Sequence, residues 1–178
     1  MSDEPDNDCG NRKREWKDND CLRIMPVHKR FRTDTVCLKC GPDYIDAMFH
    51  SRVLKMRTGN LDSWFCDKTT IRTLLAKKEK SSDITVIEGV MGYYDGAGFS
   101  TKGSSFEIAQ ITDTPVILIV NCRGISNSVG AVLKGFTTFQ ENSQIRGVIF
   151  NQMSEKLYPQ AKKSGTGTGT DSAGLSAV

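Results

Sequence analysis

The feature that most constrains the fold is an alternation of short apolar runs with segments of helical periodicity. The apolar runs are Thr35–Lys39, Ile84–Ile87, Pro115–Val120 and Ile145–Phe150, each short enough to be a strand. Pro115–Val120 is uninterrupted, which is typical of a strand buried on both faces of a sheet. Strands that alternate with helices in this way predict the α/β class, with a mainly parallel sheet.

Helices are expected in the segments that separate these strands. The apolar residues Ile71, Leu74 and Leu75 recur at helical spacing, and lysines follow them where they suit a helix C-terminus. The segments predicted to form helices are 43–56, after an initial loop, 67–80, 104–112 and 126–139.

The two ends of the chain differ from its centre. Residues 1–33 are dominated by charge and predict a mostly disordered leader, while residues 156–178 are rich in Gly, Ser and Thr and predict a flexible tail. The chain of 178 residues suits one domain, which we place at residues 34–155.

Composition excludes several classes of function. A net charge of +3 without a basic stripe argues against nucleic-acid binding. The longest apolar run is far shorter than the ~20 residues that span a bilayer, which argues against a membrane protein. The opening MSDEPDND is acidic, unlike a secretory signal, so we expect a cytoplasmic protein.

Cysteines offer one weak motif, the CxxC of Cys37 and Cys40. A zinc site built on such a pair needs a second ligand pair at matching spacing, and none follows. A redox CxxC needs a helix start, but this pair lies in the predicted strand. Packed, reduced thiols are therefore the favoured interpretation.

Two acidic segments follow predicted strands. In parallel sheets ligands bind at the carboxyl ends of the strands. Asp43 and Asp46 follow the first strand, and if the backbone is helical there both carboxylates face one way. They could then bind magnesium or orient a substrate, although a solvated turn with Asp43 as N-cap explains them about equally well.

Glu88 directly follows the second strand, in the segment IEGVMGYYDG. An acid at this place could reach a magnesium ion that bridges phosphate oxygens. Gly89 and Gly92 would let the backbone approach a ligand, and Asp95 lies in a loop that should fold back over the site. The alternative is a glycine-rich turn with one exposed acid.

Three further polar residues are weaker candidates. The hydroxyls of Ser104 and Ser105 lie at a predicted helix start, where they could bind an anion or simply cap the helix. Asn151 follows the last strand, where its amide could contact a purine edge or could be a turn residue.

Together these segments resemble one family. KCGPDYIDAMFH, NLDSW, IEGVMGYYDG, the serine-led helix, PVILIVN, SNSVGAVLKGF and IRGVIFNQM occur in the order found in the N-terminal domain of cobyrinic acid a,c-diamide synthases. The resemblance extends from Cys37 to Met153, and its specific parts are GPDYID and EGVMGYYDG. It implies a three-layer domain similar to P-loop NTPases.

The resemblance also implies a reaction. ATP, with Mg²⁺, phosphorylates the a and c side-chain carboxylates of a corrin, and glutamine-derived ammonia converts each acyl phosphate to an amide. The implied catalytic residues are Asp43, Asp46, Glu88 and Asp95, with Asp46 and Glu88 as the metal ligands. Implied contacts are Tyr44, Ser104 and Ser105 with substrate, and Asn151 with the adenine.

Two parts of that family are not found in these residues. No G-x-x-x-x-G-K-[ST] phosphate loop occurs, and no cysteine has the context of a glutaminase nucleophile. We therefore expect a partial domain without its first strand and helix, with exposed apolar surface and either marginal stability or association, for example as a homodimer.

Two alternatives stay open. A relative of this kind could amidate hydrogenobyrinic acid or nickel-sirohydrochlorin, because pocket contacts set the choice. A non-catalytic binding module that keeps the fold is the other alternative, and the missing phosphate loop favours it.

Overall fold

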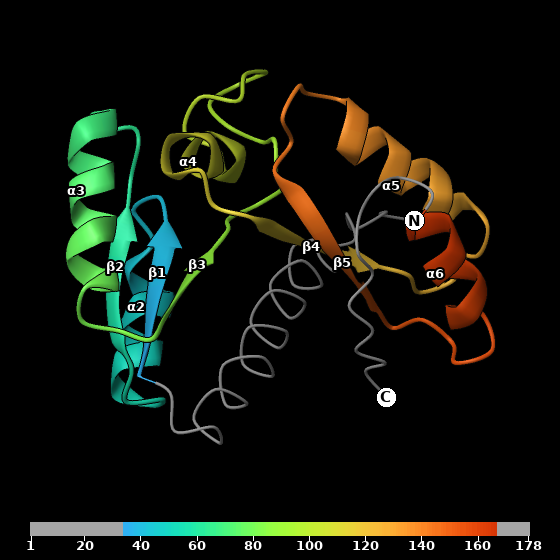
Figure 1. Ribbon diagram of the computed structural model, residues 1–178, viewed down its shortest axis with the longest axis horizontal. Helices are drawn as coiled ribbons and strands as arrows, with labels where there is room; N and C mark the ends of the chain where they lie inside the picture. The colour runs from blue at the N-terminus through green and yellow to red at the C-terminus, as the bar shows by residue number, and fades with distance from the viewer. Residues whose placement is uncertain (1–33, 167–178) are drawn as a thin grey trace, which may run out of the picture. The chain divides into compact units, whose positions relative to one another are not determined.

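The structure, a computed structural model, describes residues 34–166, which divide into two compact units at Ser105/Phe106. The first unit contains β1 (Thr35–Cys40), α2 (Tyr44–Arg52), β2 (Arg57–Leu61), α3 (Lys68–Glu79) and β3 (Ile84–Glu88) (Figure 1). From the boundary onwards follow α4 (Ser105–Thr112), β4 (Val116–Asn121), α5 (Ser128–Thr138), β5 (Ile145–Asn151) and α6 (Tyr158–Thr166).

The first unit is a three-stranded parallel sheet in the order β2-β1-β3. Lys39 of β1 donates a hydrogen bond to Asp46 of α2, so α2 lies on the face of the sheet that carries Lys39. Leu38 marks the other face, because a Cβ added to Gly59 of β2 would lie 3.2 Å from Leu38 and 3.7 Å from Lys78 of α3. Successive strand residues point to opposite faces, so α2 and α3 cover opposite faces of this sheet. The first unit thus has helix, sheet and helix layers.

The core of the first unit lies between the sheet and α3. Val36 and Leu38 of β1 and Ile71 of α3 are at most 1% exposed. Asp67 accepts a hydrogen bond from the Thr70 amide at 2.7 Å and so caps α3 at its start. This packing fixes β1, and with it the residues at the carboxyl end of β1.

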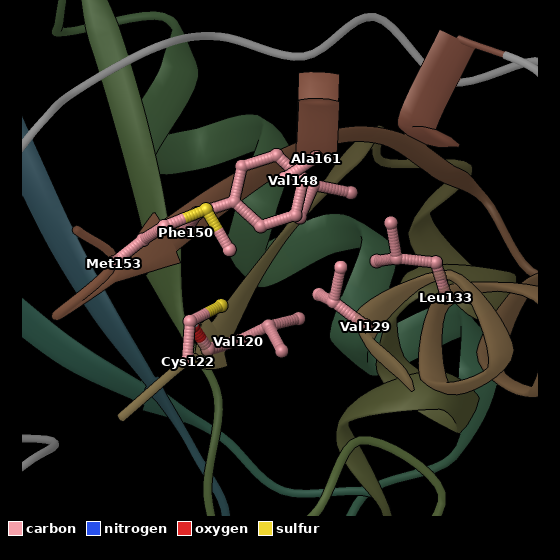
Figure 2. Close-up of a cluster of buried hydrophobic side chains, with 8 residues drawn as sticks. All are labelled: Val120, Cys122, Val129, Leu133, Val148, Phe150, Met153 and Ala161. Carbon is pink, nitrogen blue, oxygen red and sulfur yellow. The ribbon is translucent and has the colours of Figure 1, made fainter. Parts of the chain in front are cut away.

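The second unit pairs β4 with β5 in parallel. Figure 2 shows its apolar core, to which both strands, α5 and α6 contribute. Val129 and Leu133, one turn apart on α5, are 1% and 0% exposed. The residues of this cluster are Val120, Cys122, Val129, Leu133, Val148, Phe150, Met153 and Ala161.

The α/β class with parallel strands is confirmed, but the strands form two sheets, one in each unit. The expectation that Pro115–Val120 is buried on both faces is wrong. Ile117 and Ile119 are 59% and 37% exposed, while Val120 on the other face is buried. An all-apolar run therefore does not require that both faces of a strand are covered.

Two elements lie outside the predictions from sequence. β2 contains Gly59 and Asn60 and lacks apolar alternation, so the sequence does not indicate a strand there. Backbone pairing with β1 holds it in the sheet. α6 occupies the start of the segment 156–178 that was expected to be flexible, because Leu157, Tyr158 and Ala161 pack on the core of the second unit.

The predicted leader, residues 1–33, and residues 167–178 lie outside the described residues. Within the described part of the chain, no helix combines the length and apolar character needed to cross a membrane.

Candidate functional site

Buried charges gather at the carboxyl end of the first sheet. Lys39 on β1 and Glu88 on β3 are register partners, so their side chains leave the sheet on the same face. Lys39 Nζ lies 3.1 Å from Glu88 Oε1 and donates a hydrogen bond to Asp46 Oδ2 on α2. One ammonium group therefore joins carboxylates from two different elements.

This cluster is shielded from water. Lys39 is 3% exposed and Glu88 is 6% exposed. Burial alone would lower the pKa of Lys39, but the hydrogen bond to Asp46 and the charge of Glu88 outweigh it and hold that pKa well above its usual value. Lys39 is thus a fixed cation that contacts two carboxyl groups.

His50 and Cys37 extend the cluster on the same face. His50 is buried, with Nε2 3.8 Å from Glu88 Oε2 and Nδ1 3.4 Å from Cys37 Sγ. Burial, and secondarily the charge of Glu88, raises the pKa of the Cys37 thiol to about 12. Glu88 Oε2 itself is buried and has no hydrogen-bond partner within residues 34–166.

Asp43 begins α2 as its N-cap. Its carboxylate accepts a hydrogen bond from the Ile45 amide at 3.1 Å. Asn60 of β2 donates to the carbonyls of Gly41 and Asp43, both at 2.9 Å, and so holds the turn between β1 and α2. The N-cap interpretation of Asp43 is therefore confirmed, while a substrate contact stays a prediction. Tyr44, the next residue, is 70% exposed.

The loop after Glu88 is organised by its own hydrogen bonds. The exposed carboxylate of Asp95 accepts from the Gly92 amide at 3.0 Å. Ser105 Oγ accepts from the Val90 amide at 2.9 Å. Ser104 Oγ donates to the Thr101 carbonyl at 2.6 Å. The two serine hydroxyls thus pin the loop, and their contact with substrate stays a prediction.

Gly89 and Gly92 are needed for close packing in this loop. A Cβ on Gly89 would lie 2.9 Å from Ser105 Oγ, and one on Gly92 would collide with the Asp95 carboxylate. The glycines therefore allow the loop to fold tightly directly after Glu88.

Asn151 lies in the second unit, at the end of β5. It is 6% exposed, and its carbonyl accepts from the Cys122 amide at 2.8 Å. The structure describes this unit by itself, so contact of Asn151 with an adenine remains a prediction.

Asp46 and Glu88 both contact Lys39, a residue to which the sequence analysis gave no functional role. Lys39 was counted only as part of a strand, although a lysine inside a buried strand is itself a signal, because burying an ammonium is costly unless it is paired. His50 and Asn60 were also missed; they fall within the quoted segments but were given no role.

The donor set fits a magnesium ion. Carboxylate oxygens are preferred magnesium ligands, and Glu88 Oε2 is a buried oxygen without a hydrogen-bond partner among the described residues. Asp46, less than a quarter exposed, supplies a second carboxylate beside the same lysine. Such a group of charges suits the binding of phosphate with a divalent ion.

Curated proteins named cobyrinate a,c-diamide synthase are similar in sequence to this chain. The one from Priestia megaterium is 41% identical over 126 residues, or 70% of this chain and 27% of its own length. The one from Saccharolobus solfataricus is 43% identical over 120 residues, 67% of this chain and 27% of its own length.

A third relative of that name, from Sulfolobus acidocaldarius, is 42% identical over 142 residues and is covered over 32% of its length. No family model and no solved structure matches the chain. The chain is therefore a sequence relative of the cobyrinate a,c-diamide synthases, and it spans about 27% of the length of the first two.

Proposed function

We propose that this chain forms part of an enzyme that amidates the a and c side-chain carboxylates of cobyrinic acid, using ATP, Mg²⁺ and glutamine. The observation that supports this most is the buried Lys39–Asp46–Glu88 cluster at the carboxyl end of the first sheet. The likeness to relatives named cobyrinate a,c-diamide synthase supplies the substrate class.

In the proposed reaction the substrate carboxylate accepts the terminal phosphoryl group of ATP, and ammonia then displaces phosphate from the acyl phosphate. Mg²⁺ would neutralise charge on the phosphate oxygens. Asp46 and Glu88 would bind the ion, and Lys39 would hold both carboxylates in place while adding positive charge beside the transferring group.

Other residues would shape the binding surface. Asp43 and the exposed Tyr44 lie at the start of α2, next to Asp46, where they would contact the corrin side chain. Asp95, Ser104 and Ser105 would set the form of the loop after Glu88, and Asn151 would contact the adenine.

We also propose that these 178 residues do not turn over alone. The sequence holds no phosphate loop whose backbone amides and lysine would bind the ATP phosphates. The test is hydrolysis of radiolabelled ATP by the purified chain with Mg²⁺ and cobyrinic acid. We expect only background hydrolysis, and hydrolysis that depends on Glu88 would contradict the proposal of inactivity.

The function itself is tested in a hybrid enzyme. The matching part of the Priestia megaterium relative is replaced by this chain's residues from Cys37 to Met153, and products are separated by mass spectrometry. Formation of the a,c-diamide supports the proposal. A folded hybrid that makes no diamide, beside an active parent, contradicts it.

The choice of tetrapyrrole is tested separately. Cobyrinic acid, hydrogenobyrinic acid and nickel-sirohydrochlorin are titrated against the same hybrid. If the hybrid prefers hydrogenobyrinic acid or nickel-sirohydrochlorin, that compound becomes the proposed substrate in place of cobyrinic acid. Binding of a tetrapyrrole without amidation would favour the non-catalytic binding module, for which the absent phosphate loop argues.

A further inference from the structure

Three side chains that commonly bind transition metals lie together on one face of the first sheet. They are Cys37 of β1, His50 of α2 and Glu88 at the end of β3, which are 1%, 4% and 6% exposed. One donor atom from each lies within 4.8 Å of the others. Cys37 stands two residues before Lys39, so both side chains leave β1 on the same face.

We propose that Cys37, His50 and Glu88 bind a divalent ion of the zinc class. This inference goes beyond the proposed amidation. Because both ions would use Glu88 Oε2, the zinc-class ion and the Mg²⁺ of that reaction would exclude one another at this carboxylate. Three protein ligands of these types match zinc sites that keep a fourth position open.

The distances suit such an ion. Tetrahedral zinc with Zn–S of about 2.3 Å and Zn–N of about 2.0 Å places sulfur and nitrogen about 3.5 Å apart. Cys37 Sγ and His50 Nδ1 are 3.4 Å apart. The Glu88 carboxylate would have to move closer to the ion, because the three donor atoms lie within 4.8 Å of one another, which is wider than in a formed site.

Glu88 has a carboxylate oxygen that is available to bind a metal ion. Lys39 holds Oε1 at 3.1 Å, which leaves Oε2 buried and without a hydrogen-bond partner among the described residues. Oε2 lies 3.8 Å from His50 Nε2, whereas Cys37 Sγ lies beside Nδ1 of the same ring. A buried carboxylate oxygen without a hydrogen bond is costly, and coordination to a metal would remove that cost.

Ligand chemistry selects the ion. Sulfur and imidazole ligands suit zinc or cobalt and are poor ligands for magnesium. The Cys37 thiol would lose its proton to solvent on binding, and the resulting thiolate together with the Glu88 carboxylate would balance the two positive charges. Lys39 would then stay neutralised by Asp46.

The site does not use the CxxC pair. Cys37 and Cys40 are three residues apart on one strand, so their side chains leave on opposite faces. Cys40 is instead buried on the other face of the strand, at 2% exposure. The other two ligands of the ion, His50 and Glu88, come from α2 and β3, and spacing in the sequence does not reveal that they lie beside Cys37.

The test is titration of the full purified chain with Co²⁺, followed by competition with Zn²⁺. We expect one equivalent to bind, with a thiolate-to-cobalt absorption band that Zn²⁺ abolishes. Loss of groups that merely support a ligand weakens metal affinity by about 10–100-fold, so Cys37→Ser and Glu88→Gln should each weaken it by at least about 100-fold.

Matched controls separate this site from other cysteines. Cys66→Ser and the double variant Cys9→Ser/Cys21→Ser should keep the band and the affinity. A band that persists in Cys37→Ser, or no band in a wild-type chain that is folded by circular dichroism, overturns the proposal. If Cys37→Ser fails to fold, X-ray absorption of the zinc-loaded wild type decides: one sulfur with nitrogen and oxygen neighbours supports the site, and any other set contradicts it.

Discussion

The two units of this protein are both built on parallel strands, yet they bury different things. The first unit encloses Lys39, His50 and Glu88, three titratable side chains that are each less than 10% exposed. In the second unit, Figure 2 shows a buried cluster of apolar side chains. Parallel strands with helices therefore enclose charged side chains in the first unit and apolar side chains in the second.

The difference teaches where to look for function. Buried charges are costly unless they are paired, so a fold that keeps them gains something other than stability. An apolar core of the kind centred on Leu133 needs no such explanation. The candidate site therefore lies in the first unit.

The largest effect is expected from Lys39→Met. This change leaves Glu88 and Asp46 without their cation, and breaking a buried pair from one side costs about 3–5 kcal/mol. Urea denaturation of variant and wild type measures the loss. Adding Glu88→Gln to Lys39→Met should restore part of the stability, and a double variant as unstable as the sum of both single changes would break this account.

Leu133→Ala tests the apolar unit. Leu133 is 0% exposed, and such truncations cost about 2–5 kcal/mol. The same denaturation experiment should show a loss that is unchanged between low and high salt, because no charge is removed. The exposed Leu74→Ala is the control and should change stability far less.

A smaller effect concerns pH. Burial raises the pKa of Cys37 to about 12, against an ordinary value of 9.0. The folded state therefore keeps a proton that the unfolded state loses. Stability from this source is complete below pH 9 and falls as pH rises towards 12. Cys37→Ala should flatten the decline of stability over this range, and a decline as steep as in the wild type would contradict this.

The smallest effect is expected at the exposed pair of Arg57 and Asp34, whose side chains are 43% and 61% exposed. Exposed pairs contribute about 0–1 kcal/mol and weaken with salt. Asp34→Ala should therefore lower the free energy of unfolding only slightly, and less at high salt. A loss as large as that of Lys39→Met would remove the distinction between buried and exposed pairs.

Much of the fold was predictable because its signals are local. The run Thr35–Lys39 became β1, and the helical spacing of Ile71, Leu74 and Leu75 became α3. β2 was not predicted, because Arg57–Leu61 carries no apolar alternation and owes its form to pairing with β1. The exposed face of β4 was not predicted either, since a sequence does not state which faces find a partner.

The candidate site was predictable in part. The rule that parallel strands end at one edge indicated Asp46 and Glu88. It did not indicate Lys39 or His50, because their roles arise from side chains that meet across α2, β1 and β3. The hydrogen bonds by which Ser104 and Ser105 hold the loop after Glu88 were not predicted either, because they depend on tertiary structure.

The most direct test of the central claim uses Glu88 in the hybrid enzyme with the Priestia megaterium relative. Glu88→Gln keeps the size of the side chain and removes the charge that Lys39 and Mg²⁺ would share. Glu79→Gln, on the exposed end of α3, is the matched control. We predict that Glu88→Gln lowers Mg²⁺-dependent amidation by at least about 100-fold, in the range of a lost transition-state contact, while Glu79→Gln retains the parent rate. Equal rates for the two variants would contradict the account.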